Sequence, residues 1–356
     1  MSPKEPIVTV IMPAYNVEEY VSRAVESVRS QTLKDLELIV IDDGSTDRTG
    51  RILDRIADRD WRIDVIHTEN MGAPAARNLA LDRARGRWIA FFDADDWAEP
   101  HMLAEEVAFA EANDLELVVS GFVIETHWGS YGEFDAEEKS YGTIVFDDPE
   151  VFRRAAHQLF DENLLYTPWN KLFLRSRIEE LGIRFRDTFW DDFPFVLDYI
   201  RDVHRVGVLE HTFYHFQRSR IDSETSKWRP DMYEKREEEH GWMLDLLDHW
   251  GLSHDPASRE MVQRRYIERL VGCIENVCEP ACDLPNAERQ ELVRQMISSE
   301  RAQQAVVEAE PRSTMMRVML WPIRRKNVGL TMKEGKFIAF VKRHNSRMFS
   351  TLKASR

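Results

Sequence analysis

The chain has little of what marks an exported or membrane-spanning protein. It has three cysteines, Cys273, Cys278 and Cys282, a number that fits a reducing compartment. Their C-x4-C-x3-C spacing lacks the paired C-x2-C of common zinc sites, so we expect ordinary packing in a helix core. No stretch reaches the roughly 18 apolar residues of a spanning helix, and the first residues contain no apolar signal core. These absences predict a cytoplasmic protein.

Two common nucleotide-binding motifs are also missing. No G-x-G-x-x-G follows the first apolar run, and G-x-x-x-x-G-K-[ST] occurs nowhere in the sequence. These absences argue against an NAD-type turn and against the phosphate loop of P-loop NTPases. A bound diphosphate would have to be held in another way, and a metal ion on aspartates is the available one.

Negative charge dominates, but it is unevenly spread. The formal net charge is −15, yet residues 312–356 hold twelve Lys or Arg and one acid, Glu334, and so carry +11. Residues 1–311 must then carry −26. Such asymmetry predicts a basic tail that meets an anionic surface.

The tail also has the pattern of an amphipathic helix. Its apolar residues share one face and its basic residues lie around the other side, as in helices that bind membrane interfaces. The tail could instead dock onto the acidic body of the same chain or form a dimer contact, and the oligomeric state stays open. We do not expect the tail to bind nucleic acid. The apolar face holds Phe337, Phe340, Val341, Met348 and Leu352, and the basic side holds Lys336, Lys342, Arg343, Arg347 and Lys353.

Short apolar runs alternate with helical patterns through the first third of the chain. This order predicts an α/β fold with a Rossmann-like, mostly parallel sheet flanked by helices. Asn16 and Glu19 resemble a capping box and predict a helix that starts there. From about residue 231 the pattern is helical and charged. We expect an α/β domain over 1–230 (a nucleotide half at 7–125, an acceptor half at 126–230), a helical domain over 231–311 and the basic tail 312–356.

Aspartates follow two of the apolar runs directly. Asp42 and Asp43 end one of them, and Asp93, Asp95 and Asp96 end another. Open α/β sheets bind ligands at the carboxyl ends of their strands, and crowded carboxylates repel one another unless a cation offsets the charge. We predict a divalent metal that carries a diphosphate, with Mg²⁺ or Mn²⁺ favoured by oxygen ligands. A solvated acidic turn is the alternative.

Four motifs then occur in order: Ile11-Met-Pro-Ala-Tyr-Asn16, Val40-Ile-Asp-Asp-Gly-Ser-Thr-Asp47, Asn70-x-Gly-x-x-x-Ala-Arg-Asn78 and Phe92-Asp-Ala-Asp-Asp96. Together they resemble the family 2 inverting glycosyltransferases of the GT-A fold, closely over residues 7–125 and loosely to about 225. The resemblance implies transfer of a sugar from a nucleotide-sugar donor, typically a UDP-sugar, to a glycan or lipid-linked acceptor in bacterial surface-polysaccharide synthesis. The Q-x-x-R-W motif of processive relatives is absent, which favours a single addition.

The resemblance also suggests roles for individual residues. An ionised Asp42 is a pure hydrogen-bond acceptor and suits the N–H of a uracil ring, and Tyr15 offers an apolar face for the base. Asp95 is the implied direct metal ligand, with Asp93 as a ribose or metal contact. The nucleotide contacts expected in this way are Pro13, Ala14, Tyr15, Asp42, Arg77, Asp93 and Ala94.

The general base is expected further along, at Asp191-Asp192. Apolar neighbours and a like charge raise a carboxylate pKa, which suits a base. Relatives usually carry Glu-Asp here, so Asp192 takes the implied role of the base and Asp191 departs from the pattern; an N-cap of the next helix is the alternative. Diphosphate or acceptor contacts are expected from Trp169, Asn170, Lys171, Arg218 and Arg220, although core burial of Trp169 is equally compatible with the sequence.

Two other functions stay open at this point. A nucleotidyltransferase with a similar sheet would need a basic loop that binds a triphosphate after the first strand. The segment there, Pro13-Ala-Tyr-Asn-Val17, is a poor candidate for such a loop. A non-catalytic member that scaffolds a membrane assembly through its tail would show no turnover.

Overall fold

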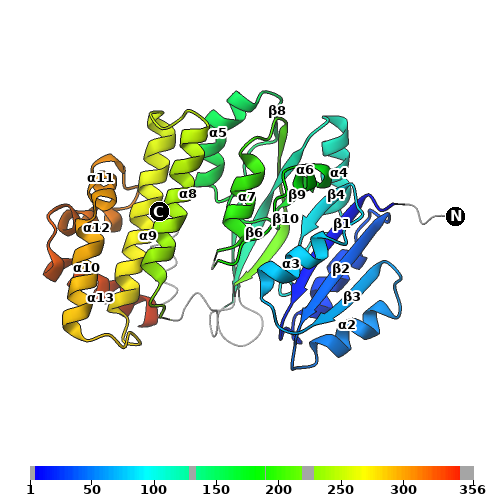
Figure 1. Ribbon diagram of the computed structural model, residues 1–356, viewed down its shortest axis with the longest axis horizontal. Coiled ribbons are helices and arrows are strands. Elements are labelled where there is room, and N and C mark those ends of the chain that lie inside the picture. Colours follow the sequence, from blue (N-terminus) through cyan, green and yellow to red (C-terminus); the bar gives the residue numbers. More distant parts are fainter. Residues whose placement is uncertain (1–4, 128–133, 189, 219–227, 345–356) are drawn as a thin grey trace. The chain divides into compact units, whose positions relative to one another are not determined.

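A computed structural model of the chain describes residues 5–127, 134–188, 190–218 and 228–344 (Figure 1). Within these ranges, the side chains of residues 314, 315 and 342–344 are left undescribed. The chain divides into two compact units, residues 1–221 and 222–356. The first unit is an α/β domain, and the described part of the second is entirely helical.

One mixed sheet forms the centre of the first unit (Figure 1). The strand order is β3-β2-β1-β4-β9-β6-β10-β5, with β7 paired to β6 and β8 paired to β10. The strands are β1 (Val8–Ala14), β2 (Leu36–Asp43), β3 (Ile63–Thr68), β4 (Trp88–Phe91), β5 (Trp97–Ala98), β6 (Leu117–His127), β7 (Phe134–Lys139), β8 (Ile144–Phe146), β9 (Lys171–Leu174) and β10 (Val206–Arg218).

The predicted parallel part of the sheet is confirmed. β1 pairs in parallel with β2 and β4, and β2 with β3. α3 packs on β1 and β2, and α4 packs on β6 and β10. β2 and β4 are buried at every residue, which explains why their apolar runs do not alternate with polar residues. The helices of this unit are α1 (Val21–Arg29), α2 (Thr49–Ala57), α3 (Ala73–Leu81), α4 (Met102–Ala112), α5 (Pro149–Asp161), α6 (Arg175–Glu180) and α7 (Asp192–Ile200).

The middle of the sheet differs from the mostly parallel one predicted. β9 lies between β4 and β6 and is antiparallel to both, while β10 is parallel to β6 and antiparallel to β5 and β8. No sequence pattern indicates this arrangement, because β9 is a four-residue strand that lies far along the chain from its neighbours. Strands of the expected acceptor half therefore lie between strands of the expected nucleotide half.

The predicted helix start at Asn16 is wrong. α1 begins at Val21, and its N-cap residue, Tyr20, makes no side-chain cap hydrogen bond. Asn16 instead adopts a φ of 51°, and its Oδ1 accepts a hydrogen bond from the Thr46 N–H at 2.8 Å. Asn16 thus fastens the loop after β1 to the loop after β2, because an asparagine in a left-handed turn can offer its side chain to a neighbouring backbone.

Six helices build the described part of the second unit. α9 packs against α8, α10, α11 and α13 and forms its centre. Cys273 and Cys278 lie in this helical core and Cys282 is also buried; all three are free thiols, as expected. The helices are α8 (Met232–His249), α9 (Pro256–Cys278), α10 (Asn286–Ser298), α11 (Glu300–Glu308), α12 (Thr314–Arg324) and α13 (Val328–His344).

The basic tail contributes to this same core. Met316, Met319 and Ile323 of α12 and Met332 and Ile338 of α13 are buried in it. Residues 312–341 therefore build part of the helical unit as well as its surface. No helix in the described residues is both long enough and apolar enough to cross a membrane.

The expected apolar face of the tail is divided in the structure. Phe337 and Phe340 are exposed, whereas Val341 is buried in the core. Of the other members, Met348 and Leu352 lie outside the described residues, as do Arg347 and Lys353.

Candidate active site

The carboxyl ends of β1 and β2 bring an exposed tyrosine and a buried acid to neighbouring strand ends. Ala14, the last residue of β1, is opposite Asp42 in the register of the two strands. Ala14 and Asp42 are buried and Pro13 is half-buried. Tyr15, just beyond the strand, is 49% exposed. An exposed ring next to an acceptor carboxylate is an arrangement that can hold a planar base by stacking and by a hydrogen bond.

Asp43 has a different surrounding from Asp42. Its carboxylate accepts hydrogen bonds from the N–H groups of Met71 (2.8 Å) and Gly72 (2.9 Å), just before α3. Gly44 follows at φ 76°, and a Cβ there would lie 2.7 Å from the Asn70 nitrogen. Asp43 and Gly44 therefore hold the loop that leads into α3, and so position Arg77 on that helix.

Arg77 joins three acids that are far apart in the sequence. Its Nη1 donates to Asp191 Oδ2 at 2.6 Å and its Nη2 donates to Asp93 Oδ1 at 2.9 Å. Nη1 also lies 3.2 Å from Asp192 Oδ1. The guanidinium is buried over the Phe185 ring, 5.2 Å from its centroid. Burial alone would lower the pKa of Arg77, but the charges of Asp192, Asp93 and Asp191 outweigh it and raise the pKa.

The acidic stretch after β4 has three members in three environments. Asp93 is half-buried and held by Arg77. Asp95 reaches solvent, yet the surrounding protein desolvates its carboxylate and, with the charge of Asp93, raises its pKa to about 6. Asp96 is buried, and its pKa is raised well above the ordinary value by desolvation and by Asp95 and Asp93. Ala94, between them, is buried.

β10 holds the acidic stretch in place. The Tyr214 hydroxyl accepts a hydrogen bond from the Asp93 N–H (3.0 Å) and donates one to Asp96 Oδ2 (2.9 Å). The Gln217 N–H donates to Asp96 Oδ1 at 2.7 Å. Asp96 therefore has a structural partner on each oxygen, and Asp93 and Asp95 are the acids left to face a ligand.

The expected general base lies at the start of α7, against the Arg77 guanidinium. Asp192 is desolvated, and this burial together with the charges of Asp191 and Asp93 raises its pKa to about 7, although Arg77 and Lys171 lower it. Asp192 Oδ1 accepts no hydrogen bond from any described residue. Asp191, by contrast, holds Arg77, and burial raises its pKa as well. A carboxylate whose pKa lies near neutrality, and whose Oδ1 accepts no hydrogen bond from the described residues, fits a general base.

Trp169, Asn170 and Lys171 are turned into the interior. Trp169 is 4% exposed and stacks on Tyr214, with ring centroids 4.6 Å apart. Asn170 Nδ2 donates to the carbonyl of Ser120 at 2.9 Å. Lys171 Nζ donates to the Asn170 side chain and to backbone carbonyls, and burial lowers its pKa well below the ordinary value. The contacts observed for these three residues are those of core residues. Their proposed contacts with a substrate stay predictions.

The two expected phosphate-binding arginines are less fully placed. Arg218 is the last residue of β10, half-buried near the Phe216 ring. Burial lowers its pKa, although the charge of Glu137 raises it. Arg220 lies outside the described residues.

His67 is a site residue that sequence reasoning missed. Its Nδ1 lies 2.7 Å from Asp42 Oδ2, and its Nε2 lies 3.0 Å from Asp54 Oδ1. The signal in the sequence was weak, since a single histidine at the end of a strand is most often structural. Only the pairing of β2 with β3, which sets Asp42 opposite His67, reveals the contact.

The acidic side chains of the site can be compared with the ligands that a metal ion requires. No group of three or more His, Cys, Asp or Glu side chains is arranged as a metal cage among the described residues. Mg²⁺, however, is commonly bound by one or two carboxylates together with substrate phosphates. Asp95 and Asp93 offer that number, and Asp95 is exposed, so that its carboxylate can reach a ligand. The residues present therefore fit a metal ion that is shared with a diphosphate.

Comparison with known proteins decides the family. The sequence model described as glycosyl transferase family 2 matches residues 9–182. Residues 9–182, nearly half of the chain, therefore carry a family 2 glycosyltransferase domain. The glycosyltransferase also has the fold of residues 1–349 of TarS from S. aureus, solved in complex with UDP-GlcNAc: the TM-score is 0.64 over 94% of this chain and 91% of that one, at 17% identity. The predicted GT-A fold and enzyme class are thus confirmed.

Relatives identified by sequence come from bacteria. The glycosyltransferase is 29% identical to the uncharacterized glycosyltransferase EpsJ of Bacillus subtilis, over 85% of this chain and 86% of EpsJ. It is 37% identical over 141 residues to WfaP of Escherichia coli, named a UDP-Glc:alpha-D-GlcNAc-diphosphoundecaprenol beta-1,3-glucosyltransferase. That match covers 39% of this chain and 55% of WfaP, so the chain spans about half the length of this relative.

Proposed function

We propose that the protein transfers one sugar, with inversion, from a UDP-sugar to a hydroxyl group of a glycan or lipid-linked acceptor. The observation that carries this is the position of Asp192. It combines a pKa raised to about 7 with contact to the Arg77 guanidinium, which also binds Asp93 of the D-x-D stretch. The Arg77 guanidinium thus contacts both the candidate base and an acid of the candidate donor site.

In this reaction Asp192 accepts the proton of the acceptor hydroxyl as that oxygen attacks the anomeric carbon. The bond from this carbon to the diphosphate breaks in the same displacement, and the nucleoside diphosphate leaves. Asp95 and Asp93 would hold a Mn²⁺ or Mg²⁺ ion, which when bound neutralises the charge that develops on the leaving diphosphate. Arg77 donates hydrogen bonds to Asp191 and Asp93, whereas Asp192 Oδ1 lies 3.2 Å from Arg77 Nη1 without accepting a hydrogen bond from it.

Two observations support the nature of the substrates. Asp42 is an acceptor next to an exposed tyrosine, which suits a base with an N–H donor such as uracil. WfaP carries a UDP-sugar donor and a diphosphoundecaprenol-linked acceptor in its name. We therefore propose a UDP-sugar donor and a lipid-linked glycan acceptor, in the synthesis of a bacterial surface polysaccharide.

A donor screen tests this proposal. The release of UDP or GDP from a panel of nucleotide sugars is measured with and without Mn²⁺. The proteins compared are the wild type, Asp192→Asn and the control Asp198→Asn. Asp198 is an acid of the same helix and is paired with Arg186. We expect metal-stimulated release that Asp192→Asn lowers by about 10²-fold or more and Asp198→Asn leaves unchanged. Release without metal would refute the metal role, and no release from any donor would favour a non-catalytic scaffold.

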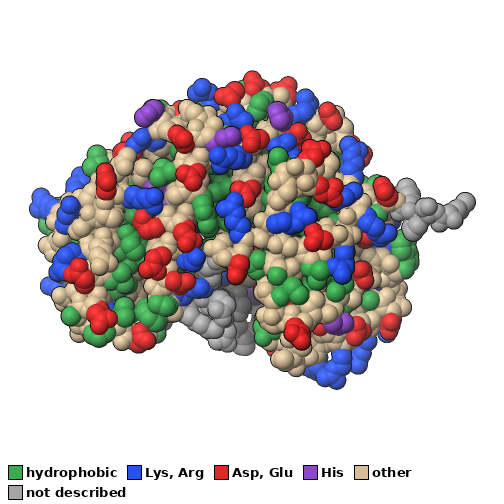
Figure 2. Space-filling model, viewed as in Figure 1, with side chains coloured by type: hydrophobic (Ala, Val, Ile, Leu, Met, Phe, Trp, Pro, Cys, Tyr) green, Lys and Arg blue, Asp and Glu red, His purple; other side chains and the backbone are tan. Residues whose placement is uncertain are grey.

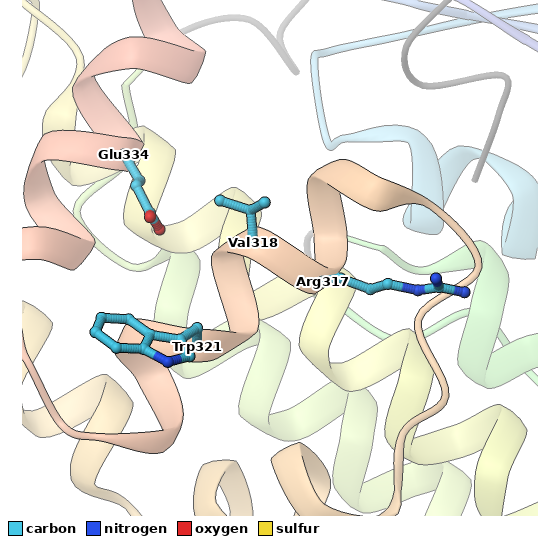
Figure 3. Close-up of a pocket in the computed structure, with 4 residues that line it drawn as sticks. All are labelled: Arg317, Val318, Trp321 and Glu334. Carbon is cyan, nitrogen blue, oxygen red and sulfur yellow. The ribbon is translucent and has the colours of Figure 1, made fainter.

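We also propose that α12 and α13 bind an anionic membrane surface. Val318, Trp321, Phe337 and Phe340 are large apolar side chains that are 48–66% exposed on these two helices. Figure 3 shows Val318 and Trp321 of α12 facing Glu334 of α13, with Arg317 extending away from them. Their exposed basic neighbours are Arg317, Arg324, Arg325, Lys326, Lys333 and Lys336.

The combination of exposed rings and cations supports an interfacial role. Aromatic side chains insert at the headgroup level, and each nearby Lys or Arg adds about 1 kcal/mol of attraction to an anionic bilayer. Elsewhere on the viewed face, acidic and basic groups are interspersed over both units (Figure 2). Such a surface would place the enzyme at the inner face of the cell membrane, beside a lipid-linked acceptor.

Co-sedimentation with vesicles of phosphatidylglycerol and phosphatidylcholine tests this surface. We expect the full chain to bind anionic vesicles and Phe337→Glu to bind them less well. Val307→Glu is a matched control, because Val307 is 75% exposed on α11, outside the proposed surface. Equal binding by Phe337→Glu and the wild type would refute the proposal.

A further inference from the structure

The acid expected to contact the base is itself held by a histidine between two carboxylates. His67 Nδ1 contacts Asp42 Oδ2 at 2.7 Å, and His67 Nε2 contacts Asp54 Oδ1 at 3.0 Å. The three residues come from β3, β2 and α2. Asp42 is buried, whereas about half of the His67 and Asp54 side-chain surfaces are exposed. The ring therefore connects a buried acceptor to a surface acid.

The close approach of α2 leaves this contact little space. A Cβ atom at Gly50 would lie 2.6 Å from Asp42 Oδ2 and 3.3 Å from His67 Cε1. The first distance is shorter than any ordinary carbon–oxygen contact, so a side chain at this position would displace the Asp42–His67 pair. The second carboxylate oxygen, Asp42 Oδ1, has a longer contact, a 3.3 Å hydrogen bond from the Ser45 N–H. Asp42 is thus fixed through Oδ2, and Oδ1 keeps acceptor capacity.

We propose that His67 is a positioning residue for the base of the donor, which orients the Asp42 carboxylate so that Oδ1 accepts an N–H from the base. This inference rests on the proposed function, in which Asp42 receives the base. An ionised carboxylate can only accept hydrogen bonds. It therefore suits uracil and guanine, which present a ring N–H, and rejects cytosine and adenine, whose ring nitrogen at that edge is itself an acceptor.

The ionisation of His67 adds a pH dependence. The charged groups that the structure places against the ring are Asp42 from β2 and Asp54 from α2. Hydrogen bonds to Asp42 and then to Asp54 raise the pKa of His67 above its ordinary value, against a smaller lowering by burial. The protonated ring donates to both acids, whereas the neutral ring can donate to one. Affinity for a uridine nucleotide should therefore be highest below the pKa of His67 and fall as pH rises through it.

Titration calorimetry with UDP and Mn²⁺ tests the inference on the full chain between about pH 6 and 9. His67→Ala should raise the Kd for UDP and the KM for the donor about tenfold, the worth of one charge-assisted hydrogen bond, with kcat little changed. His67→Asn keeps an N–H toward Asp42, so it should recover most of the affinity and lose the pH dependence. His211→Asn is the control, because His211 is an exposed histidine paired with Glu105 at 3.1 Å, and it should change nothing.

Asp42→Ala removes both acceptor oxygens and separates failure of the inference from failure of the proposed function. If Asp42→Ala weakens UDP binding while both His67 variants bind as the wild type does, His67 has no positioning role. If Asp42→Ala and the wild type bind UDP equally, or neither binds it, the proposed base site itself is wrong. Thermal melts accompany each variant, and His67→Asn provides the answer if His67→Ala does not fold. Binding of CDP, ADP and GDP is measured in the same way to test the discrimination among bases. GDP should be accepted, whereas CDP and ADP should be rejected.

Discussion

Replacing Asp192 with asparagine should abolish transfer and, at neutral and alkaline pH, stabilise the protein. The folded structure raises the pKa of Asp192 from 3.8 to about 7, mainly by desolvating it. A carboxyl whose pKa is higher in the folded state binds its proton more tightly there, so its ionised form destabilises the fold. The cost is absent below pH 3.8, develops as pH rises toward 7, and is fully present above it.

The size of this effect follows from the shift. About three pKa units correspond to about 4 kcal/mol at 1.36 kcal/mol per unit. Because 25% of the side-chain surface is exposed and solvent screens the charge, we expect the gain from Asp192→Asn to be about 2 kcal/mol. Asparagine keeps the shape of the side chain and removes the charge, so packing against Arg77 changes little.

Urea unfolding at about pH 8 and about pH 4.5 measures the prediction, since the gain should be large at the first pH and small at the second. The wild-type transfer rate should rise with pH to a plateau above about 7, because the ionised form is the base. Asp198→Asn should show neither effect. An Asp192→Asn protein that is less stable than the wild type at both pH values would refute the reasoning, as would one that retains near-normal turnover.

Three further predictions concern the residues around the site. Arg77→Met leaves Asp93 and Asp191 without their cation, so it should lower the free energy of unfolding by about 3 kcal/mol. It should also move the rise of the pH–rate profile to higher pH, because the charge of Arg77 lowers the pKa of Asp192; an unchanged profile would contradict the Arg77 contact. Trp169→Ala should lower stability by about 3–5 kcal/mol in urea unfolding, with the Kd for UDP within a few-fold of the wild type; a normal stability would favour a substrate role for this ring. Gly44→Ala should cost about 1–3 kcal/mol because of its positive φ and the nearby Asn70 nitrogen, and a normal melting temperature would contradict this.

Local sequence patterns predicted the strands well and the meeting of distant residues poorly. β1, β2 and β4 were expected from nearly continuous apolar runs, because strands buried on both faces leave that signal. The edge strand β3 was expected from a shorter run in which apolar and polar residues are mixed. The aspartates at the carboxyl ends of β2 and β4 followed directly. The four-residue β9 was beyond such reasoning, since its apolar run is too short to show a period and its partners are far away in the chain.

The contacts within the site depend on the tertiary structure. Arg77 meets acids 16 and 114 residues away, and no spacing rule predicts such a meeting. Asn170 and Lys171 looked like exposed polar contacts because polar residues rarely lie in cores. The structure buries them because backbone carbonyls of Ser120 and Leu164 supply their hydrogen bonds.

The interleaved sheet has a consequence for engineering the enzyme. β9 separates β4 from β6, and β5 has its only described strand partner in β10. A chimera that joined residues 7–125 to the later residues of a relative would therefore replace strands inside the sheet. It would need to carry over Tyr214 and Gln217 as a set, because they bind Asp96 and the backbone of Asp93. Acceptor specificity should thus be exchangeable only through loops between strands, with β9 and β10 kept as they are.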